Sequence, residues 1–425
     1  MRVRLELHDS HSRQKKRNSL LKASPGVALC AALLVSFSVY FAAPPAMSQG
    51  PASARQVYGL MWMTQVVEWG PCLLTIMMPA KEQERCLSWT RREAGSPAFH
   101  PSSGVIMMGG GDESLHGLSV RDGQRIYRVQ LPGSLVAKPT LAGARAYFGT
   151  NDAHVLRADV TSGRISWDVI VDAEVTEPVV VHKNKVFVVT GLDSIYALDR
   201  DTGETLWVHK TPLPQGITLR GQSRPFPALI AQDDAFENRI FAGHASGVLV
   251  ALDEMSGAVL YEKDLARAEA FNDIDADLIM QSGNLIAASQ SSGIFALDPA
   301  NFTERWFLDE PGIVRMASAG NYMAVAAGAG NVIGFNTVTG QVRWRFTFKK
   351  GAPTRIVVKG GRAHVASDRG PLYVLDLFTG KPLQYYGSAL GFAADPEASG
   401  DMILVNSTAG RLHALSNAFA GPAQQ

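Results

Sequence analysis

The sequence predicts an all-β protein: an eight-bladed β-propeller with four-stranded blades, whose ring is closed by N- and C-terminal strands. A short unit recurs about every 40 residues, and the intervals hold short apolar runs with alternating polar residues. Glycine (40 residues) and proline (22) separate these runs, as expected of many turns between short strands. Long stretches of helical period are missing from the sequence. A period near 40 with strand-only units indicates a propeller.

The recurring unit is a strand ending in Ala-Leu-Asp or similar, then Thr/Ser-Gly, then an aromatic residue four positions after the glycine. Clear copies are 156–167, 196–207 and 250–261, weaker copies are 295–306, 333–344 and 373–384, and a shorter one is 118–127. The Asp side chain can accept hydrogen bonds from amides two residues on, and the glycine permits positive φ. Each unit therefore predicts a tight turn between two strands.

The aromatic residue that ends each unit is predicted to fill the space between neighbouring blades, because its large apolar surface needs burial. The predicted blade-docking residues are Trp89, Tyr127, Trp167, Trp207, Tyr261, Trp306 and Trp344, with Gln384 at the equivalent position of one further unit.

Ring closure is predicted from the two ends of the repeat region. Residues 401–416 supply two strands of a last blade, and the chain then ends without an aromatic-bearing strand. Residues 85–93 look like the missing outer strand, with Trp89 one repeat before Tyr127. Pairing these segments would close the ring and protect its edges. The predicted propeller is therefore 85–418, followed by a tail, 419–425.

Residues 1–48 are predicted to be an export signal. A basic stretch precedes the apolar run 26–43, and Ala-Met-Ser at 46–48 has the form of a cleavage site. The run is also long enough to be an uncleaved inner-membrane anchor, so both readings stay open. Residues 49–84 form an apolar N-terminal extension without an assigned role. It is expected to pack on the propeller or lie at an interface.

The three cysteines fit an exported protein. Cys30 follows Leu29 inside the apolar run, where a lipoprotein signal would have a small residue, so lipidation is not expected. Cys72 and Cys86 both follow the export signal and could form a disulfide in an oxidising compartment; two buried thiols are the alternative.

Composition and motifs argue against nucleic-acid binding and common catalytic chemistries. The positive charge is concentrated in residues 1–48, which leaves the rest mildly acidic and without a nucleic-acid footprint. The sequence has no His-Glu-x-x-His, no Cys-x-x-Cys and no phosphate-binding loop. His244 is isolated in the sequence and is expected to be structural. We therefore expect a protein that is not an enzyme and needs no cofactor or metal.

The repeat resembles the pyrroloquinoline-quinone-type propeller unit, Ala-x-Asp-x-x-Thr-Gly-x-x-x-Trp, which 197–207 matches closely. Within that superfamily the chain resembles the BamB family, eight-bladed periplasmic subunits of the bacterial outer-membrane β-barrel assembly machinery. Residues 219–223 (Leu-Arg-Gly-Gln-Ser) match a Leu-Arg-Gly-Glu-Ser-type loop of that family apart from Gln for Glu. Residues 272–275 (Asn-Asp-Ile-Asp) take the place of its Ser-Asp-Val-Asp loop.

This resemblance implies a scaffold that binds the barrel-inserting subunit BamA and assists folding and insertion of outer-membrane proteins. The implied contact residues are Ile217, Leu219, Arg220, Asp273 and Asp275. Aliphatic side chains can anchor an interface, and arginine can make bidentate charge-assisted bonds. The alternative is that Leu219 packs beneath its loop and the aspartates cap turns. Nascent outer-membrane β-barrel proteins would be further partners.

The resemblance also implies a location in the periplasm in association with the outer membrane, although the chain departs from the family in lacking a lipoprotein signal. Two other functions share the repeat. A propeller that binds some other envelope protein would differ only in the two loops. Quinoprotein dehydrogenases are generally longer and carry a disulfide between adjacent cysteines, a pair that this sequence does not contain.

Overall fold

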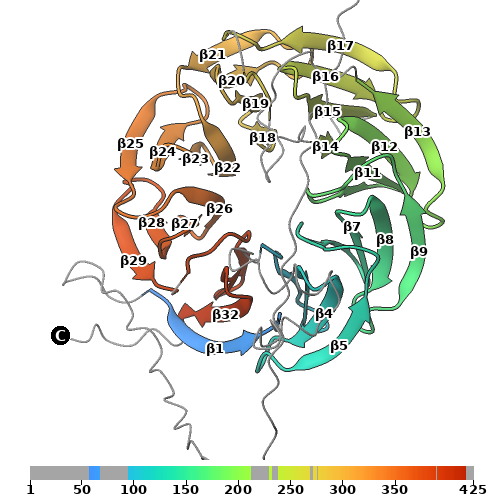
Figure 1. Ribbon diagram of the computed structural model, residues 1–425. Helices are drawn as coiled ribbons and strands as arrows, with labels where there is room; N and C mark the ends of the chain where they lie inside the picture. Colours follow the sequence, from blue (N-terminus) through green and yellow to red (C-terminus); the bar gives the residue numbers. More distant parts are fainter. Residues whose placement is uncertain are drawn as a thin grey trace, which may run out of the picture. The chain divides into compact units, whose positions relative to one another are not determined.

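The described part of the chain forms a closed ring of eight antiparallel sheets with four strands each (Figure 1). The structure is a computed structural model that describes residues 57–67, 94–211, 229–231, 238–268, 271–274, 276–388 and 390–417. All of these belong to one compact unit, Pro44–Gln425. The predicted all-β, eight-bladed propeller is confirmed.

The strands of each blade follow one another from the centre of the ring outward. Blade 1 contains β2 (Ala98–His100), β3 (Val105–Gly109), β4 (Ser114–Ser119) and β5 (Arg125–Gln130). Blade 2 contains β6 (Thr140–Ala142), β7 (Arg145–Gly149), β8 (His154–Asp159) and β9 (Ile165–Ile170). Blade 3 contains β10 (Val180–His182), β11 (Lys185–Val189), β12 (Ser194–Asp199) and β13 (Thr205–Lys210). Blade 4 contains β14 (Leu229–Ala231), β15 (Arg239–Gly243), β16 (Val248–Asp253) and β17 (Val259–Asp264).

The second half of the ring repeats this arrangement up to the last blade. Blade 5 contains β18 (Ile279–Gln281), β19 (Asn284–Ser289), β20 (Gly293–Leu297) and β21 (Glu304–Leu308). Blade 6 contains β22 (Ile313–Ala319), β23 (Tyr322–Ala327), β24 (Asn331–Asn336) and β25 (Val342–Thr347). Blade 7 contains β26 (Pro353–Lys359), β27 (Arg362–Ser367), β28 (Leu372–Asp376) and β29 (Pro382–Tyr386). Blade 8 contains β30 (Glu397–Ser399), β31 (Met402–Asn406), β32 (Arg411–Ser416) and the N-terminal β1 (Gly59–Gln65).

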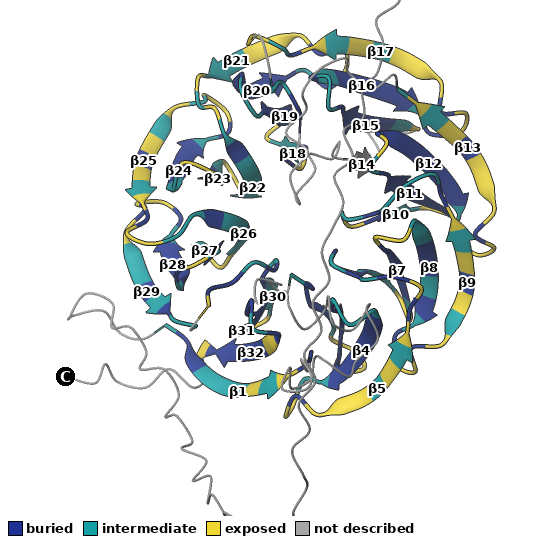
Figure 2. Ribbon diagram, in the orientation of Figure 1, coloured by how far each residue is buried: buried dark blue, intermediate teal, exposed yellow. Residues whose placement is uncertain are grey.

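The hydrophobic core lies between adjacent blades. The two middle strands of a blade are covered on both sides, so β11 (KVFVV) is buried along its whole length. The outer strand has one face in solvent, and β13 (TLWVHK) accordingly buries Trp207 between exposed neighbours. Figure 2 shows the same gradient from the middle strands to the exposed outer strands.

The aromatic residues of the repeat join each blade to the next by a hydrogen bond as well as by packing. Each ring N–H or O–H donates to the backbone carbonyl of the residue that follows the turn Asp, Asn or Ser of the next blade. Five of these bonds are Tyr127 to Val160 (2.8 Å), Trp167 to Arg200 (3.2 Å), Trp207 to Glu254 (3.0 Å), Trp306 to Thr337 (3.2 Å) and Trp344 to Leu377 (2.8 Å). Tyr261 donates to Pro299 in the same way. At six of the predicted positions the side chain is thus bonded to the neighbouring blade.

The turns take the predicted form, and their glycines are required by the neighbouring blade. In blade 3 the Asp199 carboxylate accepts bonds from the amides of Asp201 and Thr202, both at 2.9 Å. Gly203 has a φ of 80°, and a Cβ there would lie 2.9 Å from the ring of Trp167. Because the ring lies directly on the glycine, a larger residue would push the two blades apart.

The closing strand is β1, and the prediction that residues 85–93 close the ring is wrong. β1 pairs with β32 from Gly59–Ser416 to Gln65–Arg411, with a register shift between Leu60 and Trp62. The propeller therefore begins upstream of residue 85, inside the segment predicted to be an extension. Trp89 lies outside the described residues, and Trp62 takes its place in the ring, since its Nε1 donates to the Val120 carbonyl at 2.8 Å.

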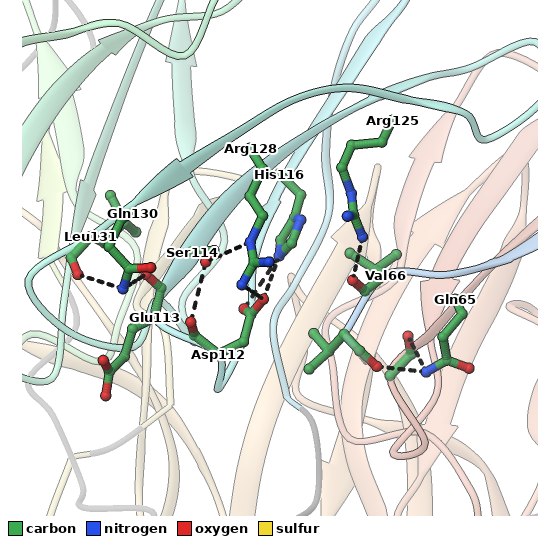
Figure 3. A network of polar contacts seen from close by, with 12 residues as sticks. Gln65, Val66, Asp112, Glu113, Ser114, His116, Arg125, Arg128, Gln130 and Leu131 are labelled. Carbon is green, nitrogen blue, oxygen red and sulfur yellow. Dashed lines mark hydrogen bonds and ion pairs between the residues drawn. The ribbon is translucent and has the colours of Figure 1, made fainter. Parts of the chain in front are cut away.

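Blade 8 is fastened on both sides of β1. On the blade 7 side, the Gln384 amide accepts a bond from the Tyr58 amide (2.7 Å) and donates to the Tyr58 carbonyl (2.8 Å), so glutamine replaces the aromatic residue here. On the blade 1 side, Arg125 donates to the Val66 carbonyl at 2.9 Å (Figure 3). Closure thus combines strand pairing with side-chain bonds to both neighbours.

We predict that Trp62→Ala lowers the free energy of unfolding by about 2–3 kcal/mol, because it removes a half-buried ring and its hydrogen bond at the seam. Met63→Ala, on the exposed face of the same strand, should change it by less than about 0.5 kcal/mol. Urea unfolding followed by circular dichroism measures both. Equal effects of the two substitutions would contradict a closing role for Trp62.

Two buried histidines, one in blade 7 and one in blade 8, make stability depend on pH. His364 Nε2 lies 3.1 Å from the Tyr58 hydroxyl, and His413 Nδ1 lies 2.8 Å from the Tyr386 hydroxyl. Desolvation by burial lowers the pKa of each to about 4, and a nearby arginine adds to the effect. Because the folded pKa lies below the ordinary 6.5, protonation favours the unfolded chain. This stabilisation is complete above pH 6.5 and is lost as the pH falls toward 4.

We expect the free energy of unfolding to fall by about 2 kcal/mol for each of these histidines between pH 7 and pH 5. Chemical unfolding at a series of pH values measures this slope. The double substitution His364→Gln and His413→Gln should flatten it, whereas His100→Gln, at the half-buried end of β2, should leave it unchanged. An unaltered slope in the double variant would show that other groups cause the pH dependence.

Candidate functional site

The direction of the strands divides the loops of the ring between two faces. The segments that join successive blades lie on one face, together with the loops between second and third strands; we call this the connecting-loop face. The turns between third and fourth strands, such as that between β16 and β17, lie on the opposite face, which we call the turn face. The two sequence-predicted partner loops belong to the segments β13–β14 and β17–β18, which begin and end on the connecting-loop face on either side of blade 4.

The predicted partner residues differ in how far the structure describes them. Ile217, Leu219, Arg220 and Asp275 lie outside the described residues. Asp273 is described and is only 3% exposed. Its main-chain carbonyl accepts a bond from the Gln290 amide at 2.8 Å. Burial places Asp273 inside the loop, so any effect of its side chain on a partner would be indirect.

Asn272 holds the second loop in shape through three side-chain bonds. Its Nδ2 donates to the Ala268 carbonyl at 2.8 Å, and its Oδ1 accepts from the Ala268 amide at 3.3 Å and from the Ser292 hydroxyl at 2.8 Å. The Ser289 hydroxyl donates to the Asn272 carbonyl at 3.0 Å. The loop is therefore fixed to blade 5 by satisfied polar groups.

Ile274 fixes the same loop to blade 4. It is buried, and its amide donates to the His244 carbonyl at 3.2 Å. A Cβ on Gly243 would lie 2.3 Å from the Ile274 side chain, so the glycine is needed for this close approach. The second loop thus contacts both blades that flank it.

A buried polar chain lies at the start of the first loop. His244 Nδ1 lies 3.2 Å from Asp193 Oδ2, and His244 Nε2 lies 3.2 Å from the Thr211 hydroxyl. The same hydroxyl lies 3.4 Å from His209 Nε2. Asp193 also accepts a bond from the Ala245 amide at 3.1 Å. The chain therefore connects the outer strand of blade 3 to the loop between β15 and β16 of blade 4.

His209 lies at the outer end of this hydrogen-bonded group, and its surroundings favour the neutral imidazole. Burial lowers the pKa of His209, and the neighbouring His244 lowers it further, against an opposing effect of Asp193. A neutral His209 can share the Thr211 hydroxyl with His244 without placing two positive imidazoles side by side. We assign these hydrogen-bonded side chains a positioning role, because they hold Thr211, the residue at which the first loop begins.

A second acid–histidine pair lies on the same face in blade 1 (Figure 3). Asp112 accepts bonds from buried His116 (3.1 Å) and from Arg128 (3.0 Å), while Arg128 Nε donates to the Ser114 hydroxyl at 3.0 Å. Burial opposes ionisation of Asp112, but the bond and charge of His116 and the charge of Arg128 lower its pKa overall. This pair stabilises the loop between β3 and β4.

Ion pairs also link the inner ends of different blades. Glu177, before β10 of blade 3, pairs with Arg315 of blade 6 at 2.5 Å. Lys138 of the β5–β6 connection pairs with Glu397 of blade 8, and Arg355 pairs with Asp395 at 3.2 Å. Burial raises the pKa of Glu177 in spite of the nearby arginines. The inner ends of these blades are thus joined by charged side chains.

The described residues offer no arrangement for metal chemistry. Among them, no group of three or more His, Cys, Asp or Glu side chains is placed to hold a metal ion. Within the same residues, no helix is long and apolar enough to cross a membrane. Cys72 and Cys86, predicted as a disulfide pair or as two thiols, lie outside the described part of the chain.

Sequence reasoning found both loops but missed the residues that anchor them. His244 was expected to be structural, which fits its burial, but nothing indicated that it contacts both loops. Asp193, His209 and Thr211 are scattered along blade 3 and belong to no motif. The single usable signal was the position of Thr211 directly before the long segment that interrupts the repeat.

Comparisons with known proteins agree with the repeat assignment. A family model described as "Outer membrane protein assembly factor BamB" matches residues 80–171, 111–333 and 328–420. A protein of that name from Burkholderia pseudomallei is 23% identical over 86% of this chain and 95% of its own length. One from Moranella endobia is 20% identical over 67% of this chain and 73% of its own.

Solved structures support the fold. The crystal structure of BamB from Moraxella catarrhalis superposes with a TM-score of 0.65 at 19% identity, covering 76% of this chain and 95% of that one. The quinohemoprotein alcohol dehydrogenase ADHIIG from Pseudomonas putida HK5 superposes with a TM-score of 0.63 at 14% identity, covering 87% of this chain and 78% of that one. At these identities the likeness is one of fold.

We predict that Asn272→Ala loosens the second loop, because the main-chain groups of Ala268 and the Ser292 hydroxyl lose their partner; the cost should be about 1–2 kcal/mol. Hydrogen exchange of the backbone amides from 266 to 274 measures the effect. Asn301→Ala, at an exposed turn of blade 5, is the control. The role assigned to Asn272 is wrong if exchange in this loop is the same in both variants.

Proposed function

The chain belongs to the BamB family of outer membrane protein assembly factors, and from this membership we propose that it is a non-enzymatic scaffold subunit of the machinery that assembles outer-membrane β-barrel proteins. Its partner would be the barrel-inserting subunit BamA, bound through the two loops on the connecting-loop face. Nascent β-barrel proteins would be its indirect clients. Its place of action would be the periplasmic side of the outer membrane.

The observation that best supports this proposal is the position of His244 between the two loops. Its imidazole contacts Thr211, where the first loop departs, and its carbonyl accepts the bond from Ile274 of the second loop. Two segments about 50 residues apart in sequence are thereby attached to one buried residue. A rigid common base is what a two-loop interface needs, since a preorganised surface loses less entropy on binding.

Within this site the residues would have different tasks. Ile217 and Leu219 would supply the apolar anchor, and Arg220 would bind a carboxylate or a main-chain carbonyl of the partner. Asp275 would add a charge on the second loop. Buried Asp273 would set the shape of that loop rather than touch the partner.

Scaffolding suits the rest of the ring better than catalysis does. The polar clusters of the connecting-loop face consist of groups bonded to one another within a blade or between adjacent blades, and the inner ends of the blades are joined by ion pairs. A stiff ring of this kind presents loops in fixed positions. The fold shared with a quinohemoprotein dehydrogenase makes enzyme activity the alternative, and the experiment below separates the two.

We predict that the tagged full-length protein recovers BamA from detergent-solubilised envelopes, and that Arg220→Glu lowers recovery at least about tenfold, since a charge reversal in an interface centre costs more than 1.4 kcal/mol. Arg121→Glu makes the same charge change on the turn face and should not alter recovery. Quantitative mass spectrometry of the eluate measures all three.

Other results of this pull-down distinguish the binding site from the scaffold function. Recovery of BamA with all three proteins would reject the loop as the site but keep the scaffold function. Failure of all three, with circular dichroism showing folded protein, would reject the scaffold function. Quinone- and calcium-dependent dye reduction in that case would favour the dehydrogenase alternative.

A further inference from the structure

The turn face carries an arc of exposed apolar side chains that the proposed function does not use. Each turn between third and fourth strands has the same pattern: a capping residue, a covered residue, then two exposed ones. In four consecutive blades the first exposed position is apolar, and in the three preceding blades it is polar. The apolar residues are Met255, Ala300, Val338 and Phe378, and the polar ones are Arg121, Thr161 and Asp201.

Folding does not require these four apolar residues. The residue before each of them supplies the carbonyl that receives the bond from the neighbouring blade, and the capping side chain satisfies the turn amides, as Asp376 does for Phe378 and Thr379. Met255 is 64% exposed, Val338 49% and Phe378 50%. The Tyr322 and Phe378 rings pack at right angles with their centroids 4.9 Å apart, and half of the Phe378 surface stays in solvent. Four such side chains at equivalent turns of consecutive blades indicate an interaction surface.

The arrangement of the arc fits a flat partner. Because the four residues occupy equivalent positions of a repeated unit, they lie at the same level around the ring, along the circumference from β16–β17 to β28–β29 (Figure 1). A lipid surface is flat on this scale and accepts separate apolar side chains at several points. Lys381 is exposed at the same end of blade 7, where its ammonium group could reach a lipid phosphate. Lys359, also exposed there, donates one bond to the Ala398 carbonyl at 3.3 Å.

The chain also enters the propeller on this face. Gly59, the first residue of β1, pairs with Ser416 at the turn-face end of β32. Residues 44–56 separate the first described residue from the apolar run 26–43, which the sequence marks as an export signal or membrane anchor. That stretch reaches at most about 45 Å when extended. An anchor retained there would hold the turn face toward the membrane.

We propose that the turn face of blades 4–7 docks on a lipid bilayer, with Met255, Ala300, Val338 and Phe378 entering the interfacial region. The connecting-loop face, with the proposed partner loops, would then point away from the membrane. The docking does not depend on the partner proposed above, and its test uses lipid alone.

The test measures contact at single positions, because the apolar leader could bind vesicles by itself. In the full-length protein with Cys30, Cys72 and Cys86 changed to serine, an NBD fluorophore is attached at Val338→Cys. Vesicles contain phosphatidylethanolamine and phosphatidylglycerol, with or without lipids that carry a nitroxide quencher high on the acyl chain. The matched control is Thr161→Cys, the equivalent position in polar blade 2.

We expect NBD at position 338 to shift to the blue and to rise about twofold or more in intensity on adding vesicles, since interfacial insertion removes water from the probe. Nitroxide lipids should then quench it, whereas position 161 should stay unchanged. Adding Met255→Ser and Phe378→Ser should abolish the response at 338 without loss of fold, because both side chains are exposed.

Three results would overturn the proposal. The first is an unchanged probe at position 338 with vesicles. The second is equal quenching at positions 338 and 161, which would show that the apolar arc does not direct the contact. The third is a probe at 338 that ignores lipid but is shielded in native envelopes, which would assign the arc to a protein partner. The Arg220→Glu pull-down tests the partner loops independently of all three.

Discussion

The hydrogen bond from the ring of one blade's aromatic residue to a main-chain carbonyl of the next blade is the contact on which the whole ring depends. A propeller blade has a complete sheet of its own, so nothing in its main-chain pairing attaches it to a neighbour. Packing of apolar faces holds adjacent blades together but does little to define the angle between them. The donor on the ring fixes the angle, and the glycine beneath the ring lets the blades approach. Repeated around the circle, these two features define a blade-to-blade rotation that closes after eight steps.

How far the fold follows from the sequence depends on the range of each interaction. The turns and docking residues were predicted because cap, glycine and aromatic residue lie within twelve positions of one another, and the same local chemistry repeats. The closing strand was not predicted, because β1 finds β32 across more than 340 residues and has a shifted register at Trp62. Residues 85–93 matched the expected pattern through one tryptophan. Apolar Gly59–Gln65 instead was assigned to an extension, since no turn unit precedes it.

The candidate site shows the same limit. The two loops could be located because they interrupt a regular repeat and resemble family loops. Their common base could not, because Asp193, Thr211 and His244 meet only after two blades have stacked. The burial of Asp273 could not be predicted either, because the sequence match of residues 272–275 does not distinguish buried from exposed positions. Residues 217, 219, 220 and 275 lie outside the described part of the chain, so their roles rest on the resemblance and the proposed experiment.

Closure by β1 affects how the protein folds during and after its synthesis. Among the described strands, the one that completes blade 8 is synthesised first, and its partner β32 is synthesised last. Seven blades can therefore form in order as they emerge, while the main-chain groups of β1 stay unpaired. Contacts of such long sequence separation are slow to form, and open strand edges invite pairing with other chains. An exported chain would face this waiting period in the periplasm, and a nascent propeller would itself be a client for chaperones until its final strand arrives.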